Sequence, residues 1–398
     1  MLSEQSVPVV RATLPAIGAN IGEIAERFYT RLFADRPELL RDLFNRGNQA
    51  SGEQQKALAG SIAAFAAALI EHPDTRPDVM LSRIANKHAS LGITADQYKL
   101  VHRHLFAAIG EVLGDAVTPE VAAAWDEVYW LMANALIAIE ARLYQAAGTA
   151  EGDVWRTMEI AGRQEETADA VSLELRTTDG SPTGSFRPGQ YVSVQVELPD
   201  GARQIRQYSL SRTSTGTLWR ITVKRVRDGA GPEGEVSSWL HENARVGDTI
   251  NVSRPFGDLV LPEGDGPLLL ASAGIGVTPM LSMLHHLADE AADRPLTVIH
   301  ADRAPFDHPH RDEQRRLVET IPGARMHLWY EEGLEHAPEA SHGRADATGL
   351  ELPEDVTAYL CGPLPFMRAV RGDLIRQGVP AQAIHYEVFG PDLWLGGE

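Results

Sequence analysis

Glycine and proline, the residues that most often interrupt helices, are distributed unevenly along this chain of 398 residues. Residues 1–146 contain 8 of the 35 glycines and 6 of the 24 prolines, although they make up more than a third of the chain. Both residue types destabilise helix interiors. The first third is therefore expected to be mostly helical, and the remaining two-thirds to be rich in turns.

Hydrophobic residues of the first third repeat every three or four positions, as expected for the buried face of a helix. The pattern is clearest over 17–32, 58–69 and 121–143. Thr118 and Pro119 precede the last of these segments and suit a helix N-cap and first turn. Small residues and glycine follow at about 145–153, where we expect the first domain to end.

Two other patterns follow along the chain. From 154 to 262, short alternating segments are separated by Gly, Pro and Asp, which predicts a small antiparallel β-barrel. From about 266, apolar strands alternate with helical or loop segments, which is typical of a parallel doubly wound sheet. We therefore expect an all-α domain at 1–147, an antiparallel β-barrel domain at 152–262, and an α/β domain with a parallel sheet at 263–398.

The net charge of −19 restricts the partners of this chain. An acidic surface disfavours nucleic acids and anionic membranes, because both are negatively charged. The sequence shows no recognisable targeting segment and no apolar run long enough to span a bilayer. The single cysteine, Cys361, cannot form an internal disulfide, which fits a reducing compartment. We expect a cytoplasmic monomer without stable membrane insertion.

A glycine-containing segment follows the first strand expected in the α/β domain and begins a helix. Its glycines would permit a tight turn and close approach of a pyrophosphate, and the helix N-terminus offers free N–H groups. Thr278 can cap this helix, and Pro279 suits its first turn. A third glycine is missing, so an ordinary turn without a ligand explains this motif equally well. The candidate contacts are Gly274, Ile275, Gly276, Val277, Thr278 and Pro279.

A second segment, Cys361-Gly362-Pro363, follows the fourth expected strand of this domain. It therefore lies at the same carboxyl edge of the sheet, where ligands bind in such folds. Cys361 itself suits a small buried residue and a nicotinamide contact equally well.

The barrel region contains a basic segment, 187–227, with eight Arg or Lys residues and only two acids. In so acidic a chain, this indicates either a local anion or a solvated strand face. Within it, Arg206-Gln207-Tyr208-Ser209 supplies a guanidinium for phosphate, a ring for stacking and a hydroxyl group. A second helix start able to accept an anion is expected at 234–240.

These four motifs occur in an order that resembles the ferredoxin–NADP reductase-like superfamily, and the ordered set is more specific than any one motif. The resemblance implies FAD on the barrel, NADH or NADPH on the α/β domain, and hydride transfer to the flavin. It places Arg206 at the pyrophosphate, Tyr208 on the isoalloxazine, and Ser209 near its reactive nitrogen. The further flavin contacts that it implies are Tyr191, Gln207, Gly234, Val236, Ser237, Glu387, Val388, Phe389 and Gly390.

The helical domain contains a histidine, His88, shortly before a helix break at Gly92. Alone, such a histidine is more often a surface or core residue than a metal ligand. Gln54 and Leu58, however, are spaced to share one helix face. Together with the segments 27–29, 44–49, 87–88, 97–98 and 140–144, these residues resemble the flavohaemoglobins, and the resemblance covers essentially the whole chain.

This second resemblance implies haem b, with His88 as the proximal iron ligand. Tyr98 and Glu140 would hydrogen-bond to the far side of the imidazole, orienting the ring and raising its basicity. Without the resemblance, both would be interpreted as an ordinary helical tyrosine and a solvated glutamate. The distal pocket would be lined by Tyr29, Gln54 and Leu58, and Phe44 would be a further cofactor contact.

The activity implied by the resemblance is that of a nitric oxide dioxygenase, which converts NO and O2 to nitrate using NAD(P)H, FAD and haem. Two alternatives remain open. The chain could mainly reduce dioxygen, free flavin or ferric iron, or it could be a gas-binding sensor or store, which the lack of a recognisable DNA-binding or signalling segment disfavours. Asp302 could hold a ribose hydroxyl and Arg303 a 2′-phosphate, and we favour NADH.

Overall fold

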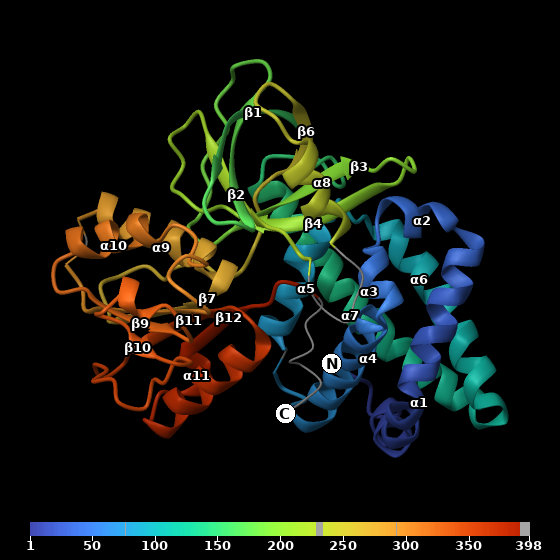
Figure 1. Ribbon diagram of the computed structural model, residues 1–398. Helices are drawn as coiled ribbons and strands as arrows, with labels where there is room; N and C mark the ends of the chain where they lie inside the picture. Colours follow the sequence, from blue (N-terminus) through green and yellow to red (C-terminus); the bar gives the residue numbers. More distant parts are fainter. Residues whose placement is uncertain (76, 228–233, 292, 391–398) are drawn as a thin grey trace.

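The computed structural model describes residues 1–75, 77–227, 234–291 and 293–390. It contains a helical domain, an antiparallel sheet and a parallel sheet in the order predicted from the sequence (Figure 1). None of the helices within these ranges is long and apolar enough to cross a bilayer.

The helical domain buries one continuous core of aliphatic and aromatic side chains, including Phe28, Leu81 and Trp125. Thr118 is the N-cap of the last helix, as predicted, and its hydroxyl accepts a hydrogen bond from Val121 N. The helices are α1 (Ser6–Asp35), α2 (Pro37–Asp42), α3 (Arg46–Ala50), α4 (Glu53–Glu71), α5 (Asp78–Leu91), α6 (Ala95–Leu113) and α7 (Pro119–Ala146).

The break after α5 is sharp because Gly92 has a φ of +76°, a conformation that only glycine adopts without strain. A side chain at this position would also collide with the chain that leaves the helical domain, because its Cβ would lie 2.9 Å from Gly152 O. Gly92 therefore ends α5 and lets the interdomain segment pass against it.

The middle domain is a six-stranded antiparallel sheet with the order β4-β3-β6-β1-β2-β5. A bridge between Leu210, just after β4, and Ile221 of β5 brings the two edge strands together, which closes the sheet into the predicted barrel. Its elements are β1 (Trp155–Glu165), β2 (Ala170–Thr177), β3 (Tyr191–Glu197), β4 (Arg203–Ser209), β5 (Trp219–Lys224), α8 (Glu235–Asn243) and β6 (Thr249–Ser253).

The last domain is a parallel sheet with the order β10-β9-β8-β7-β11-β12. The first strand, β7, lies at the centre, so the strand order reverses between β7 and β11, and such a reversal opens a crevice at the carboxyl ends. The strands are β7 (Leu268–Ala273), β8 (Leu296–Asp302), β9 (Arg325–Tyr330), β10 (Ser341–His342), β11 (Thr357–Cys361) and β12 (Ile384–Glu387). The helices are α9 (Val277–Asp289), α10 (Arg311–Thr320) and α11 (Leu364–Arg376).

One strand of this sheet was not predicted. The two-residue strand β10 is too short to produce an alternating pattern, so Cys361 ends the fifth strand of the domain and not the fourth. The predicted domain limits fall in the segments between α7 and β1 and between β6 and β7, and we keep them as proposed limits.

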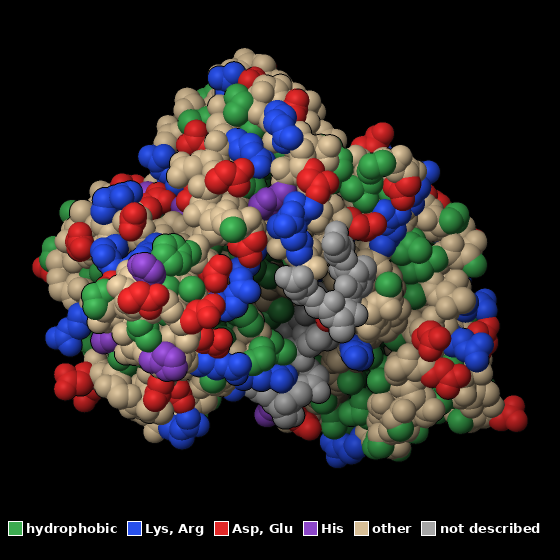
Figure 2. Space-filling model, in the orientation of Figure 1, with side chains coloured by type: hydrophobic (Ala, Val, Ile, Leu, Met, Phe, Trp, Pro, Cys, Tyr) green, Lys and Arg blue, Asp and Glu red, His purple; other side chains and the backbone are tan. Residues whose placement is uncertain are grey.

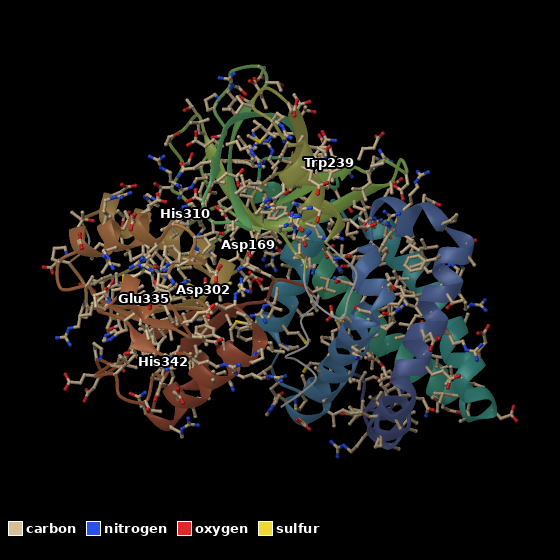
Figure 3. All side chains as sticks on the ribbon, viewed as in Figure 1. Asp169, Trp239, Asp302, His310, Glu335 and His342 are labelled. Atoms are coloured by element: carbon tan, nitrogen blue, oxygen red, sulfur yellow. The ribbon has the colours of Figure 1, made fainter. Side chains whose placement is uncertain are left out.

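The α/β domain also contacts the barrel through a buried polar cluster around His310 (Figure 3). His310 Nε2 lies 2.9 Å from Thr222 Oγ1 of β5, and His310 Nδ1 lies 3.0 Å from Glu313 Oε2. Glu313 in turn pairs with Arg220 of the barrel at 3.0 Å. Charged groups on both sides therefore hold the two domains together.

Candidate functional site

Three helices bring His88, Tyr98 and Glu140 into one hydrogen-bonded group. His88 of α5 places Nδ1 2.9 Å from the Tyr98 hydroxyl of α6 and 2.9 Å from Glu140 Oε1 of α7. Tyr98 donates its hydroxyl hydrogen to the same carboxylate oxygen across 2.5 Å. The glutamate predicted to be solvated in the absence of the resemblance is in fact buried, with 2% of its surface exposed.

This group leaves the other ring nitrogen of His88 available. Burial and the nearby Glu140 charge raise the pKa of Tyr98, so this phenol keeps its proton and acts as a donor. Glu140 can then accept from both Tyr98 and the Nδ1–H of His88, which leaves the lone pair on Nε2. Among the described residues, none is hydrogen-bonded to Nε2, and the donor set therefore fits a histidine that ligates iron.

The second predicted set gathers around Tyr29 in α1. The ring of Phe44 lies edge-on to that of Tyr29, with centroids 5.7 Å apart. Burial raises the pKa of Tyr29 to about 12, and the nearby side-chain amides of Gln54 and Gln49 only partly offset this shift. Tyr29 therefore remains a proton donor at neutral pH. Leu58 lines an apolar cavity of about 40 Å³ between α1, α4, α6 and α7, and the residues that line this cavity do not include Tyr29, Phe44 or Gln54.

Gln49 is a residue of this set that was not predicted from the sequence. It lies in α3, which has only five residues, and so short a helix gives no periodic pattern. Its Nε2 atom is buried and makes no hydrogen bond of normal geometry. The adjoining Gln55 donates to Gln49 Oε1 at 3.1 Å.

The predicted flavin residues lie on β3, β4 and the start of α8. Ser209 of β4 is directly opposite Tyr191 of β3, and α8 packs beside β4. The Ser209 Oγ atom is buried, and no residue within the described ranges forms a hydrogen bond with it. Gly234 precedes α8 with no space for a side chain, because a Cβ would lie 2.5 Å from Ser237 Oγ. These features position a hydroxyl and a helix N-terminus at one end of the barrel.

Arg206 differs from the other basic residues of this segment. Burial lowers its pKa, and within the described ranges no carboxylate lies within ion-pair distance of it. A buried guanidinium without a counter-ion fits a site that binds an anion from outside the protein. Tyr208, two residues later, is half-buried, and burial raises the pKa of its phenol.

Half of the eight basic residues in the segment 187–227 have an explanation that the sequence did not suggest. Arg203, Arg220, Lys224 and Arg225 form ion pairs with acids from outside the basic segment. The partners of Arg203 and Arg220 belong to the other two domains. These four ion pairs therefore join the segment to the other two domains and to other parts of the barrel domain.

The glycine loop before α9 has a different geometry from the predicted one. Gly274 has a φ of +54°, which makes the tight turn. Gly276 instead allows close packing within the protein, because a Cβ there would lie 2.2 Å from Cys361 O. The prediction that Thr278 caps the helix is wrong: α9 begins at Val277, one residue earlier, and the Thr278 hydroxyl donates to Ile275 O at 3.0 Å.

A cleft of about 390 Å³ lies where the three domains meet. It is lined by the loops 273–276 and 362–364, by Val388, Phe389 and Gly390, and by Lys224 and Glu53. Figure 2 shows a hollow on the face where the three domains come together. The Cys361 side chain is fully buried in the core and does not line this cleft, which favours its interpretation as a small buried residue.

The segment after β12 connects the cleft to the helix that carries His88. Arg83 of α5 donates to Tyr386 O, and Lys87 donates to Gly390 O, each at 3.0 Å. Burial and the neighbouring Asp258 raise the pKa of Glu387 to about 8. Its Oε2 atom is buried and has no hydrogen-bond partner among the residues that the structure describes. Helix α5, which carries His88, is therefore in direct contact with the segment 386–390, which we expect to lie beside the flavin.

Comparisons with protein-family models agree with this division. Residues 26–136 match the globin family, 157–260 match the oxidoreductase FAD-binding domain, and 270–372 match the oxidoreductase NAD-binding domain. The chain therefore holds haem, FAD and a nicotinamide dinucleotide.

Curated relatives and solved structures match over nearly the whole chain. A flavohemoprotein of Rhizobium meliloti is 39% identical, covering 99% of this chain and 100% of the relative. One from Bordetella pertussis is 42% identical, covering 98% and 99%. The crystal structure of flavohemoglobin from Malassezia yamatoensis with bound FAD and heme has a TM-score of 0.89 at 38% identity, covering 98% and 100%. This chain belongs to the flavohemoprotein family.

Proposed function

We propose that this protein is a nitric oxide dioxygenase that uses NADH to convert NO and O2 to nitrate. The observation that carries the proposal is the hydrogen-bonded group of His88, Tyr98 and Glu140 in a chain that also contains a complete reductase. A solved FAD/NAD-binding domain of a nitric oxide dioxygenase from Vibrio cholerae is 38% identical, with a TM-score of 0.56, and covers 59% of this chain and 99% of its own length.

When bound, haem supplies an iron that binds dioxygen and takes single electrons from FAD, which receives hydride from NADH. The protein would hold that iron through Nε2 of His88, while Glu140 accepts the Nδ1 hydrogen and orients the ring. Tyr29 would donate its hydroxyl hydrogen to negative charge that develops on the distal side.

On the reductase side, the barrel would hold the flavin. Arg206 would pair with the pyrophosphate, and Ser209 would offer its unpartnered hydroxyl to the flavin ring. Tyr208 would pack against the isoalloxazine, and Glu387 would lie beside it. The dinucleotide would enter the cleft between the loops 273–276 and 362–364.

The end of β8 supports NADH over NADPH. The Asp302 carboxylate is buried, and its Oδ1 accepts from Arg303 N at 2.9 Å. Its Oδ2 lies 3.7 Å from His300 Nε2 and accepts no hydrogen bond from any described residue. A carboxylate here suits a ribose hydroxyl and repels a 2′-phosphate. Arg303, the residue that could have held the phosphate, already lies 3.5 Å from Asp307.

The proposal is tested by measuring nitrate formed per NADH consumed under NO and air. We expect about two nitrates per NADH, because one NADH supplies two electrons and each conversion of NO to nitrate consumes one electron. NADH oxidation without nitrate would contradict the proposal. Comparing turnover with and without NO would then identify a reductase of dioxygen or ferric iron.

A further inference from the structure

The short helix α3 lies between the barrel and the pocket of Tyr29. Its first residue, Arg46, is held by two carboxylates of the barrel domain. Arg46 Nη1 lies 2.6 Å from Asp200 Oδ2, and Nη2 lies 2.7 Å from Glu235 Oε1. Since Glu235 is the first residue of α8, the start of α3 is attached to the helix start that we assign to the flavin.

A second connection runs through Gln204 of β4, which is fully buried. Its amide nitrogen donates to Arg41 O at 2.9 Å and to Phe44 O at 3.2 Å, so it holds the segment that precedes α3. Its amide oxygen accepts from Arg46 N at 3.3 Å and from Arg206 Nη1 at 3.4 Å. One amide oxygen is therefore shared between the arginine assigned to the pyrophosphate and the start of α3.

The other end of this segment reaches Tyr29. The ring of Phe44 packs edge-on against the Tyr29 ring, with centroids 5.7 Å apart. Gln49, the fourth residue of α3, lies near the Tyr29 hydroxyl without a hydrogen bond of normal geometry to it. Phe33 completes the contact, with its ring centroid 5.3 Å from that of Phe44 and 5.6 Å from that of Tyr29. The segment 44–50 thus contacts the barrel at one end and the proposed distal donor at the other.

We propose that α3 couples occupancy of the flavin-pyrophosphate site to the placement of the Tyr29 hydroxyl, which makes Arg46 a positioning residue. The inference rests on the proposed roles of Arg206 and Tyr29. A ligand shifts a linked group only if it changes that group's contacts. Arg206 Nη1 donates to Ile205 O at 2.7 Å and more weakly to the Gln204 oxygen at 3.4 Å, and a pyrophosphate is a stronger, charged acceptor than either. The Gln204 oxygen then accepts only from Arg46 N, and this hydrogen bond, which holds the start of α3 against the barrel, becomes stronger.

The test measures the rate at which dioxygen dissociates from the ferrous haem protein, with FAD bound and after FAD has been removed. We expect FAD removal to raise this rate roughly 2- to 30-fold in the unaltered protein. We expect Arg46→Ala to raise it to a similar extent with FAD bound, and to abolish the response to FAD removal. The infrared stretch of bound carbon monoxide should shift in parallel, because it responds to the nearby hydroxyl dipole.

The matched control is Arg220→Ala, which breaks an ion pair between the barrel and the α/β domain. Arg220 pairs with Glu313 at 3.0 Å, and Glu313 belongs to α10 and not to α3 or to the segment that precedes it. This variant should leave the dissociation rate unchanged. A double variant refines the test: Arg46→Ala should add nothing in a Gln49→Ala background, because coupled positions are not additive.

Equal dissociation rates with and without FAD, together with no effect of Arg46→Ala, would overturn the coupling if Tyr29→Phe still raises the rate. If Tyr29→Phe also has no effect, the proposed role of Tyr29 fails and the coupling fails with it. These measurements use no NO, so their outcome is separate from the nitrate test of the proposed function. Thermal unfolding of each variant shows whether a rate change reflects loss of the fold.

Discussion

The hydroxyl of Tyr98 and the carboxylate of Glu140 lie 2.5 Å apart, and the same carboxylate oxygen is 2.9 Å from Nδ1 of His88. A buried carboxylate is costly unless it is hydrogen-bonded, and here one oxygen can accept from two donors. The arrangement directs both hydrogens toward Glu140. It therefore determines which nitrogen of His88 has the free lone pair.

Replacing that acceptor should weaken the proposed iron site. We expect Glu140→Gln to lower the rate of NADH-driven nitrate formation roughly 10- to 100-fold and to raise the iron reduction potential, because the imidazole becomes less basic. Tyr144→Phe is the control, since the Tyr144 hydroxyl donates to Ile93 O in the same domain. An unchanged potential in Glu140→Gln would contradict this role.

Removing the Tyr29 hydroxyl should release dioxygen faster. A hydrogen bond to a charged group contributes about 1.5–3 kcal/mol, so Tyr29→Phe should raise the dissociation rate by roughly one to two orders of magnitude. Because the pKa of Tyr29 is about 12, the rate in the unaltered protein should not change between pH 6 and pH 9 as a result of this group. Stopped-flow displacement of dioxygen by carbon monoxide measures both.

Glu387 should make the fold less stable as the pH rises. Its folded pKa of about 8 lies above its ordinary value of 4.5, so the folded chain keeps a proton that the unfolded chain releases between these values. Stability is therefore lost as pH rises through this window. Denaturant midpoints of the full chain from pH 5 to pH 8 should fall less steeply for Glu387→Gln. Parallel curves for the two proteins would exclude the effect.

Gly276→Ala should change the shape of the nucleotide cleft, because the added methyl group would collide with the backbone of β11. Its Cβ would lie 2.2 Å from the backbone oxygen of Cys361, so the loop or β11 must shift, at a cost of about 1–3 kcal/mol. We expect a raised KM for NADH and a lower melting temperature. Gly266→Ala is the control, because a Cβ there meets no atom within 4 Å. Equal behaviour of the two variants would argue against this packing role.

Sequence patterns predicted the elements whose signals are long and periodic. The helix over 121–143 and the first apolar strand after about residue 266 have hydrophobic patterns over most of their length, and the structure confirms them as parts of α7 and β7. The helix start at Thr278 was misplaced because the chain enters α9 directly from the turn Gly274–Gly276.

Contacts between domains were beyond the reach of the sequence. Gln204 and Arg46 are ordinary residues of a strand and a loop until the fold brings them together, because they are 158 positions apart. The ion pairs of the basic segment were missed for the same reason. Gln49 lay within a quoted segment, but only the tertiary structure shows that it faces Tyr29.

The contact between Lys87 and Gly390 completes a closed loop of domain contacts. The helical domain meets the barrel at Arg46, the barrel meets the α/β domain at His310, and the α/β domain returns to the helical domain at α5. If each domain contacted only the next one along the chain, the domains could rotate about two hinges. Because each of the three domains contacts both others, a large rotation requires one of the three interfaces to separate. Opening of the cleft to admit a nucleotide must therefore separate one of these three domain interfaces. The distance between the haem and flavin sites is fixed as long as all three interfaces remain in contact.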